Sequence, residues 1–344
     1  MKEAPPLEGD RFGNAPAPRE SPHVVGHEEA QAMVRTAWDA GRLPHALLIG
    51  GAEGIGKATL AYAIARFVLS GGAAPAHSIS VDPSHPAARQ VAALSHPDLM
   101  VLRRVPNDSG KLPSMIPAEQ VRRVRSFFGS TAALGGWRVC VVDTLDEMNA
   151  QGANALLKTL EEPPPRALFL LVCHAPGRVL PTIRSRTRLV RLRPLGEADV
   201  LAALDDLKPQ MDDLDPGRLP AAAAAAEGSV RRAIVLARGA GLEVRAATER
   251  LLEQMPDARP EEMHALGARL QGDKADGLDL FIEAVSDWIA HALTAQRYDR
   301  ARLVRLGEVW DKVRRAAAEA DTFNLDRKAL VFRIFTELGA ALRG

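Results

Sequence analysis

The sequence has only two cysteines in 344 residues, and they lie inside apolar runs rather than in a repeating cysteine pattern. So few cysteines exclude a disulfide framework and leave too few thiols for a cysteine-based zinc cluster. Cys140 and Cys173 are therefore expected to be buried thiols in a reducing compartment, for which the cytoplasm is the default. His27, His45 and His174 lack the spacing of metal ligands, so no metal site is expected.

Long apolar runs and an excess of one charge are also absent. No uninterrupted apolar stretch approaches the ~18 residues that a membrane helix requires, and the N-terminus lacks the apolar core of a signal peptide. We therefore expect a soluble protein with no membrane partner. With 44 Lys and Arg against 43 Asp and Glu, the net charge of +1 gives no argument for nucleic-acid or membrane binding.

What is present is the composition of a globular protein, with 47% hydrophobic and 25% charged residues, and a length that predicts two or three domains. Residues 1–23 are rich in proline, glycine and charge, which predicts a flexible leader. We expect an α/β phosphate-loop domain at 24–193, a small helical lid domain at 194–240 and a helical collar domain at 241–344.

The domain prediction depends on how apolar runs alternate with helical patterns. Short apolar runs predict strands at 46–49, 99–102, 139–142, 168–172 and 189–192, with helices at 57–70, 118–128 and 149–160 between them. Continuous apolar strands separated by helices predict a parallel sheet covered on both faces. Beyond Pro194 we expect only helices, at 197–207, 220–227, 230–238, 276–296, 300–320 and 325–342, the last of these capped by Asn324.

Residues 51–59, GAEGIGKAT, follow the first strand and open a helix, as a phosphate loop does. The glycines allow backbone N–H groups to surround phosphate oxygens, and Lys57 would reach the β and γ phosphates. Ala58 occupies the position of the hydroxyl that holds Mg²⁺ in such loops. The segment predicts phosphate-loop ancestry and leaves present-day nucleotide turnover open.

Asp143 ends the third strand, where phosphate-loop enzymes place an acidic residue in the Mg²⁺ shell. Thr144 follows it, whereas hydrolases have a glutamate there to activate water. Asp146 and Glu147 come slightly later, and their spacing favours an Asp146 N-cap region for the next helix over a catalytic base. The missing hydroxyl and base both indicate weak or absent Mg²⁺ binding and little intrinsic ATPase.

Two arginine segments have functional as well as structural interpretations. Arg186 lies in the basic stretch 182–188, which is either a solvated turn or an arginine finger that reaches a γ-phosphate in a neighbouring subunit. Arg231 lies in the first turn of a helix for which we expect Ser229 as N-cap. Because a cation there opposes the helix dipole, a role toward a bound nucleotide is the functional alternative.

Together these segments resemble a known family. The runs GRLPHALLIGGAEGIGKATLAYAIARFVL, WRVCVVDTLDEMNAQGANALLKTLEEPPPRALFLLVCHAP, LPTIRSRTR and GSVRRAI are similar to bacterial DNA polymerase III clamp-loader subunits of the delta-prime type, which are AAA+ proteins. The resemblance spans about residues 24–238, and the closing NLDRKALVF segment is also similar.

The resemblance implies an AAA+ module of two domains with a helical collar that builds a ring of five subunits. Its implied task is to load the sliding clamp onto primed DNA during replication, as an accessory subunit of a DNA-directed DNA polymerase (a nucleotidyltransferase) that is not itself catalytic. The implied partners are the gamma/tau motor subunits and the delta subunit.

The family's functional positions carry over to residues of this chain. They are the phosphate loop (Gly51, Gly54, Gly56, Lys57, Thr59), the second acidic motif (Asp143), the arginine finger supplied in trans (Arg186) and the second sensor (Arg231). Thr187 replaces the cysteine of the family's Ser-Arg-Cys signature. Many relatives carry four zinc-binding cysteines after the phosphate loop, but residues 70–97 contain none, so we expect no zinc and a loop and helix of unknown use.

Two alternatives remain open from the sequence. One is an ATP-hydrolysing motor of the gamma/tau type, against which Ala58 and Thr144 count. The other is a stand-alone nucleotide-binding regulator, for which the C-terminal helical region has no obvious use. Whether ATP or ADP still binds to the altered loop is left open.

Overall fold

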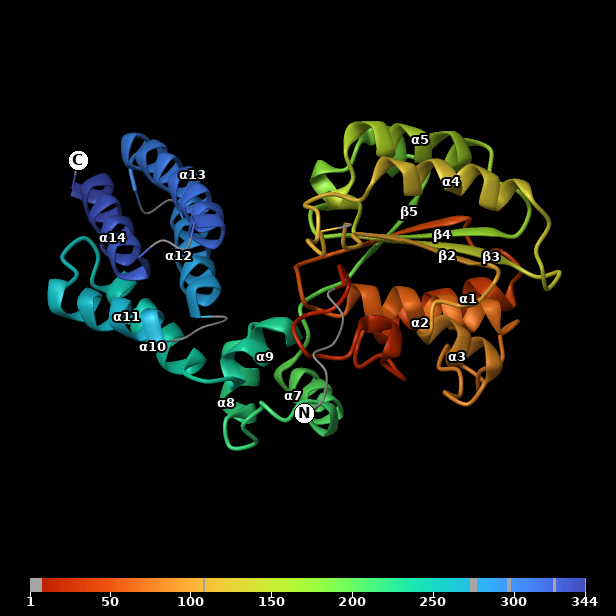
Figure 1. Ribbon diagram of the computed structural model, residues 1–344, viewed down its shortest axis with the longest axis horizontal. Helices are drawn as coiled ribbons and strands as arrows, with labels where there is room; N and C mark the ends of the chain where they lie inside the picture. The colour runs from red at the N-terminus through yellow and green to blue at the C-terminus, as the bar shows by residue number, and fades with distance from the viewer. Residues whose placement is uncertain (1–7, 108, 273–276, 296–297, 324–325, 344) are drawn as a thin grey trace. The chain divides into compact units, whose positions relative to one another are not determined.

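The computed structural model describes residues 8–107, 109–272, 277–295, 298–323 and 326–343 (Figure 1). The chain divides into two compact units, Met1–Asp212 with Glu227–Arg231 (unit 1) and Asp213–Ala226 with Arg232–Gly344 (unit 2). The segment expected to form a lid is thus shared: α7 (Glu197–Leu207) belongs to unit 1 and α8 (Leu219–Ala225) to unit 2. A separate lid and collar stay a prediction.

Unit 1 is built on a five-stranded parallel sheet, as the sequence predicts. Its strands are β1 (Ala46–Gly50), β2 (Leu99–Arg103), β3 (Arg138–Asp143), β4 (Ala167–Cys173) and β5 (Arg188–Arg191), in the order β2-β3-β4-β1-β5. Each expected strand is confirmed to within one residue at its ends. Because all strands run in the same direction, their C-terminal ends form one edge of the sheet, the carboxyl edge, and their starts form the amino edge.

Helices cover both faces of this sheet. On one side lie α1 (Glu28–Asp39), α2 (Lys57–Leu69) and α3 (Pro86–Ala92), and on the other lie α4 (Ala118–Gly129) and α5 (Ala150–Glu161) (Figure 1). Alternate strand residues point to opposite faces, so Leu47 and Ile49 join one core cluster while Ala46 and Leu48 join the other. The uninterrupted apolar strands follow from this two-sided burial. The free thiols of Cys140 and Cys173 are buried, as expected.

The first 23 residues were expected to form a flexible leader, and this is wrong for the described part that begins at residue 8. A short 3-10 helix (Pro18–Glu20) packs near α2 and α3, and Ala15 and Ala17 are buried. Glu8 and Asp10 in this segment form ion pairs with Arg103, at the end of β2. Composition suggested disorder because Arg103 and the helices on which this segment packs lie far away in the sequence.

The described residues of unit 2 form helices and the segments that connect them, also as predicted. Besides α8 and most of α9 (Val230–Ala237), it contains α10 (Gly241–Glu253), α11 (Pro260–Gly272), α12 (Gly277–Thr294), α13 (Arg300–Phe323) and α14 (Arg327–Arg343). The pairs α11–α14, α10–α12, α12–α13 and α13–α14 pack together, with the Phe281 and Phe335 rings 5.9 Å apart. The expected Asn324 cap lies outside the described residues.

Within the part of the chain that the structure describes, no helix is both long and apolar enough to cross a membrane.

Candidate functional site

The phosphate-loop segment connects β1 to α2 at the carboxyl edge of the sheet. Gly54 and Gly56 have φ values of 77° and 91°, a region that L side chains rarely adopt, and Gly56 caps α2. A side chain at Gly54 could not be accommodated, because its Cβ would lie 2.6 Å from the Cβ of Arg231. Gly51 opens the loop and Thr59 lies half-buried in the first turn of α2. The expected strand–loop–helix context is present.

Lys57 is buried and its Nζ donates a hydrogen bond to the Ala52 carbonyl, within the same loop. Burial lowers the pKa of Lys57 to about 8, although the nearby carboxylates of Glu53 and Asp143 act in the opposite direction. Lys57 therefore has a partner inside its own loop, while Ala58 beside it supplies no hydroxyl for a metal ion.

Asp143 is buried at the end of β3. Burial raises its pKa to about 7, and the carboxylates of Asp10 and Glu147 add to this effect against the charge of Lys57. Glu147, which we do not expect to act as a catalytic base, forms a 2.8 Å ion pair with Arg104 just after β2. Among the described residues, no group of three or more His, Cys, Asp or Glu side chains could hold a metal ion.

The expectation that Asp146 caps the following helix is wrong. Asn149 is the N-cap of α5, and its side chain accepts a 2.8 Å hydrogen bond from the Gly152 N–H. Asp146 instead accepts hydrogen bonds from the backbone N–H groups of His174, at 2.6 Å, and Ala175, at 3.1 Å. It thus joins the segments that follow β3 and β4, a long-range contact that local spacing could not reveal.

The first turn of α9 and the residue before it contact the phosphate loop, as the expected role of Arg231 requires. The Val230 N–H donates to the Gly54 carbonyl at 2.9 Å, and the Ser229 hydroxyl donates to the Glu53 carbonyl at 3.0 Å. Arg231 itself forms an ion pair with the Glu53 side chain, and its guanidinium lies 4.4 Å from the centre of the Phe12 ring. Arg231 is therefore at the loop but engaged by residues of its own chain.

Sequence reasoning missed His27, which also contacts the loop. Its Nε2 lies 2.6 Å from the Ile55 carbonyl oxygen, and its backbone adopts a left-handed conformation at the start of α1. No spacing rule indicates this contact, since it joins residues that are distant in the sequence.

Arg186 lies at the opposite edge of the sheet. It precedes β5, whose residue Arg188 pairs with Leu47 near the start of β1, whereas the phosphate loop follows the end of β1. Arg186 forms a 2.9 Å ion pair with Glu161 and donates to the Thr182 carbonyl at 2.9 Å. The structure therefore brings together every predicted nucleotide-facing residue except Arg186.

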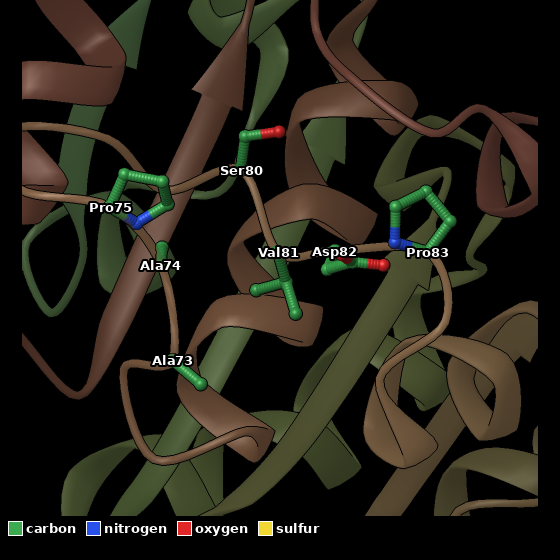
Figure 2. A pocket seen from close by; sticks show the side chains of 7 residues that line it. All are labelled: Ala73, Ala74, Pro75, Ser80, Val81, Asp82 and Pro83. Atoms are coloured by element: carbon green, nitrogen blue, oxygen red, sulfur yellow. The ribbon is translucent and has the colours of Figure 1, made fainter.

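A cavity of about 560 Å³ lies in the segment between α2 and α3 that we expected to be a loop and helix (Figure 2). Figure 2 shows Ala73, Ala74, Pro75, Ser80, Val81, Asp82 and Pro83 around it. None of the predicted site residues lines this cavity.

Comparison with known proteins adds independent information. A family model described as "DNA polymerase III, delta subunit" matches residues 26–196. DNA polymerase III subunit delta' of Pseudomonas aeruginosa is 41% identical over 142 residues, which is 41% of each chain. The Escherichia coli protein of the same name is 36% identical over 162 residues, 46% of this chain and 45% of that protein.

A third relative is the gamma/tau subunit of DNA polymerase III from Mycobacterium tuberculosis, 31% identical over 188 residues, 53% of this chain and 30% of that protein. This chain spans less than half the length of each of these three relatives.

Proposed function

Residues 26–196 belong to the DNA polymerase III delta-subunit family, as their motifs predict, and we propose that this chain is a clamp-loader subunit of the delta-prime type. In this role it is a largely non-hydrolysing stator that supplies Arg186 to the ATP site of a neighbouring subunit. Its partners would be gamma/tau ATPase subunits and a delta subunit in a ring of five, which loads the sliding clamp onto primed DNA.

The observation that carries this proposal is the position of Arg186 relative to its own phosphate loop. The two lie at opposite edges of one sheet, and β1, with five residues, separates the edges by roughly 15 Å. An arginine side chain does not span that distance, so Arg186 cannot contact a phosphate held in the loop of the same molecule. A nucleotide contact by Arg186 must therefore be made to another subunit.

The groups at the carboxyl edge support the non-hydrolysing part of the proposal. Ala58 and Thr144 lack the functional groups that would hold Mg²⁺ and activate water, and Glu147 is paired with Arg104. The loop itself retains the glycine conformations that fit a phosphate group. If ATP or ADP binds, Gly54, Gly56, Lys57 and Arg231 are the residues that would hold it, with weak or no Mg²⁺.

The second candidate is an ATP-hydrolysing subunit of the gamma/tau type. It is favoured by the retained Lys57 at the start of α2 and Asp143 at the end of β3, and by the similarity to a gamma/tau subunit. Steady-state ATPase of the isolated chain separates the two candidates. We expect no turnover above background, and about one turnover per second, a typical enzymatic rate, would favour the motor.

The proposal is tested by reconstituting the chain with gamma/tau and delta subunits and replacing Arg186 by alanine. We expect normal assembly and a partial loss of clamp- and DNA-stimulated ATPase, because only the site that faces Arg186 is affected. Arg188→Ala is the matched control, since Arg188 is an exposed arginine two residues away. Wild-type ATPase and clamp loading with Arg186→Ala would contradict the proposal.

A further inference from the structure

Residues 8–20, here called the N-terminal strap, are held by a buried cluster of four charges. Arg19 forms ion pairs of 2.6 Å with both Glu8 and Asp10. Arg103 also pairs with both carboxylates, and its distance to Glu8 is 3.0 Å. The side chain of Asp10 is 0% exposed. Tyr62, on α2, adds a 3.4 Å hydrogen bond to Asp10. The strap is therefore packed into unit 1 as part of its folded structure.

The charge cluster lies at the carboxyl edge of the sheet. Arg103 is the last residue of β2, and its register partner on β3 is Asp143. The strap backbone lies close against this edge, since a Cβ at Gly9 would come within 2.7 Å of the Arg104 carbonyl oxygen. The carboxylate of Asp10 is near enough to Asp143 to raise its pKa. Asp10, paired with Arg19 and Arg103, thus lies beside the residue that would face a metal–phosphate group.

The strap also engages the segment that contacts the phosphate loop. Phe12 lies two residues after Asp10, about 7 Å of extended chain, and stacks against the guanidinium of Arg231 at 4.4 Å. Arg231 in turn pairs with Glu53 in the loop. The strap therefore connects the ends of β2 and β3 with the arginine expected to meet a nucleotide.

The C-terminal part of the strap is anchored to two helices. The Arg66 guanidinium on α2 donates to the Arg19 carbonyl at 3.1 Å, and the Arg19 Nε donates to the Ala92 carbonyl of α3 at 3.2 Å. With this end fixed, the part from Glu8 to Phe12 is held against the edge of the sheet rather than moving freely in solvent.

We propose that the N-terminal strap is an intramolecular occupant of the nucleotide-facing edge, which lowers the affinity of this chain for nucleoside triphosphates. The physical argument is competition for the same groups. A triphosphate needs the N–H groups of the Arg231 guanidinium, which pair with Glu53 while Phe12 stacks on the guanidinium face and holds it in that position. Binding must therefore draw Arg231 away from Glu53 and from the Phe12 end of the strap. The proposal rests on the phosphate-loop assignment made above but not on the role of Arg186.

The test uses the full chain and measures its affinity for Mg²⁺-ATP by titration calorimetry. Phe12→Ala removes the stack on Arg231 and leaves the charge cluster intact, so we expect ATP to bind about 2- to 30-fold more tightly, the range that a cation–π contact spans. Phe127→Ala is the matched control, because Phe127 stacks on Arg138 in the same way, at 4.9 Å, on α4. We expect the control to leave the affinity unchanged.

A second variant, Glu8→Gln with Asp10→Asn, weakens the other end of the strap, and its folding is checked by circular dichroism. If it folds, we expect a further gain in affinity. Independently of any variant, saturating Mg²⁺-ATP should speed hydrogen exchange at the amides of residues 8–20 of the wild-type chain.

Unchanged affinity in Phe12→Ala, or ATP binding that leaves the strap amides equally protected, would overturn the proposal. So would undetectable binding in both the wild type and Phe12→Ala, since a site freed of its occupant must bind. The Arg186 experiment reads out a different site, so either proposal can fail while the other stands.

Discussion

Two arginines at opposite edges of the sheet in unit 1, Arg103 and Arg186, are held in different ways. At the carboxyl edge, Arg103 pairs with Glu8 and Asp10, whose side chains are 15% and 0% exposed, whereas the Arg231–Glu53 pair at the same edge is 47% and 54% exposed. At the amino edge, Arg186 is 35% exposed and pairs with Glu161, which is 47% exposed. An exposed pair of this kind contributes only about 0–1 kcal/mol, so Arg186 is released at little cost.

The difference indicates which edge can act on another molecule. Buried pairs leave an uncompensated charge when one member is lost, whereas an exposed arginine exchanges its partner for water or for a phosphate. The Arg103 cluster is therefore arranged for internal stability, whereas Arg186 can exchange its partner for an external contact.

The largest expected effect is at the amino edge, with Arg186→Lys. Lysine keeps the charge but not the planar fork, so with Arg186 in its proposed role the ATPase of the neighbouring site should fall about 10³- to 10⁵-fold. Single-turnover ATP hydrolysis by the reconstituted complex separates the rate at this site from the rates at the other ATP sites. Full activity with lysine would mean that only the charge matters, and the contrast between the edges would lose its functional meaning.

The next effect is on stability, at the carboxyl edge, with Arg103→Met. Removing this guanidinium leaves Asp10 buried with one partner fewer, which should cost about 3–5 kcal/mol of unfolding free energy. Hydrogen exchange at the amides of β2 and β3 in urea measures it. The exposed Arg188→Met should change stability by about 0.5 kcal/mol or less. Equal effects at both positions would remove the distinction between the edges.

A smaller effect concerns pH and Glu8. Although burial alone would raise the pKa of Glu8, hydrogen bonds and charges from Arg19 and Arg103 lower it from 4.5 to about 2. Because the folded-state pKa is depressed, the stabilisation is fully present above pH 4.5 and is lost as pH falls toward 2. Thermal melts of Glu8→Gln should differ most from wild type at neutral pH and converge in acid. A difference that grows on acidification would contradict this.

The smallest expected effect is that of Lys57→Met on the reconstituted complex. Since Lys57 donates to Ala52 and Ala58 supplies no metal-binding hydroxyl, total ATPase should change by less than about twofold, far below the effect of losing an arginine finger. Steady-state ATPase of the complex measures it. A tenfold loss would show that the carboxyl edge also takes part in turnover.

Much of this arrangement was predictable from the sequence. The apolar runs at Ala46 and Leu168 and the glycines before Lys57 are local signals, and they gave the parallel sheet and the phosphate loop. The helices of unit 2 followed from their amphipathic periodicity. Where local signals misled, at residues 8–23 and at Asp146, the decisive partners lie far away in the sequence.

The sequence by itself determined the helices and strands, the parallel direction of the strands and the residues that could face a nucleotide. It did so because periodicity and glycine placement act over a few neighbouring positions. Only the tertiary structure decided which of these residues form ion pairs with other residues of the chain. Asp10 meets Arg103 across 93 positions, and Glu53 meets Arg231 across 178. Such pairs depend on how strands and loops converge at one edge of the sheet. That convergence is a property of the packed chain and leaves no pattern in any short segment of it.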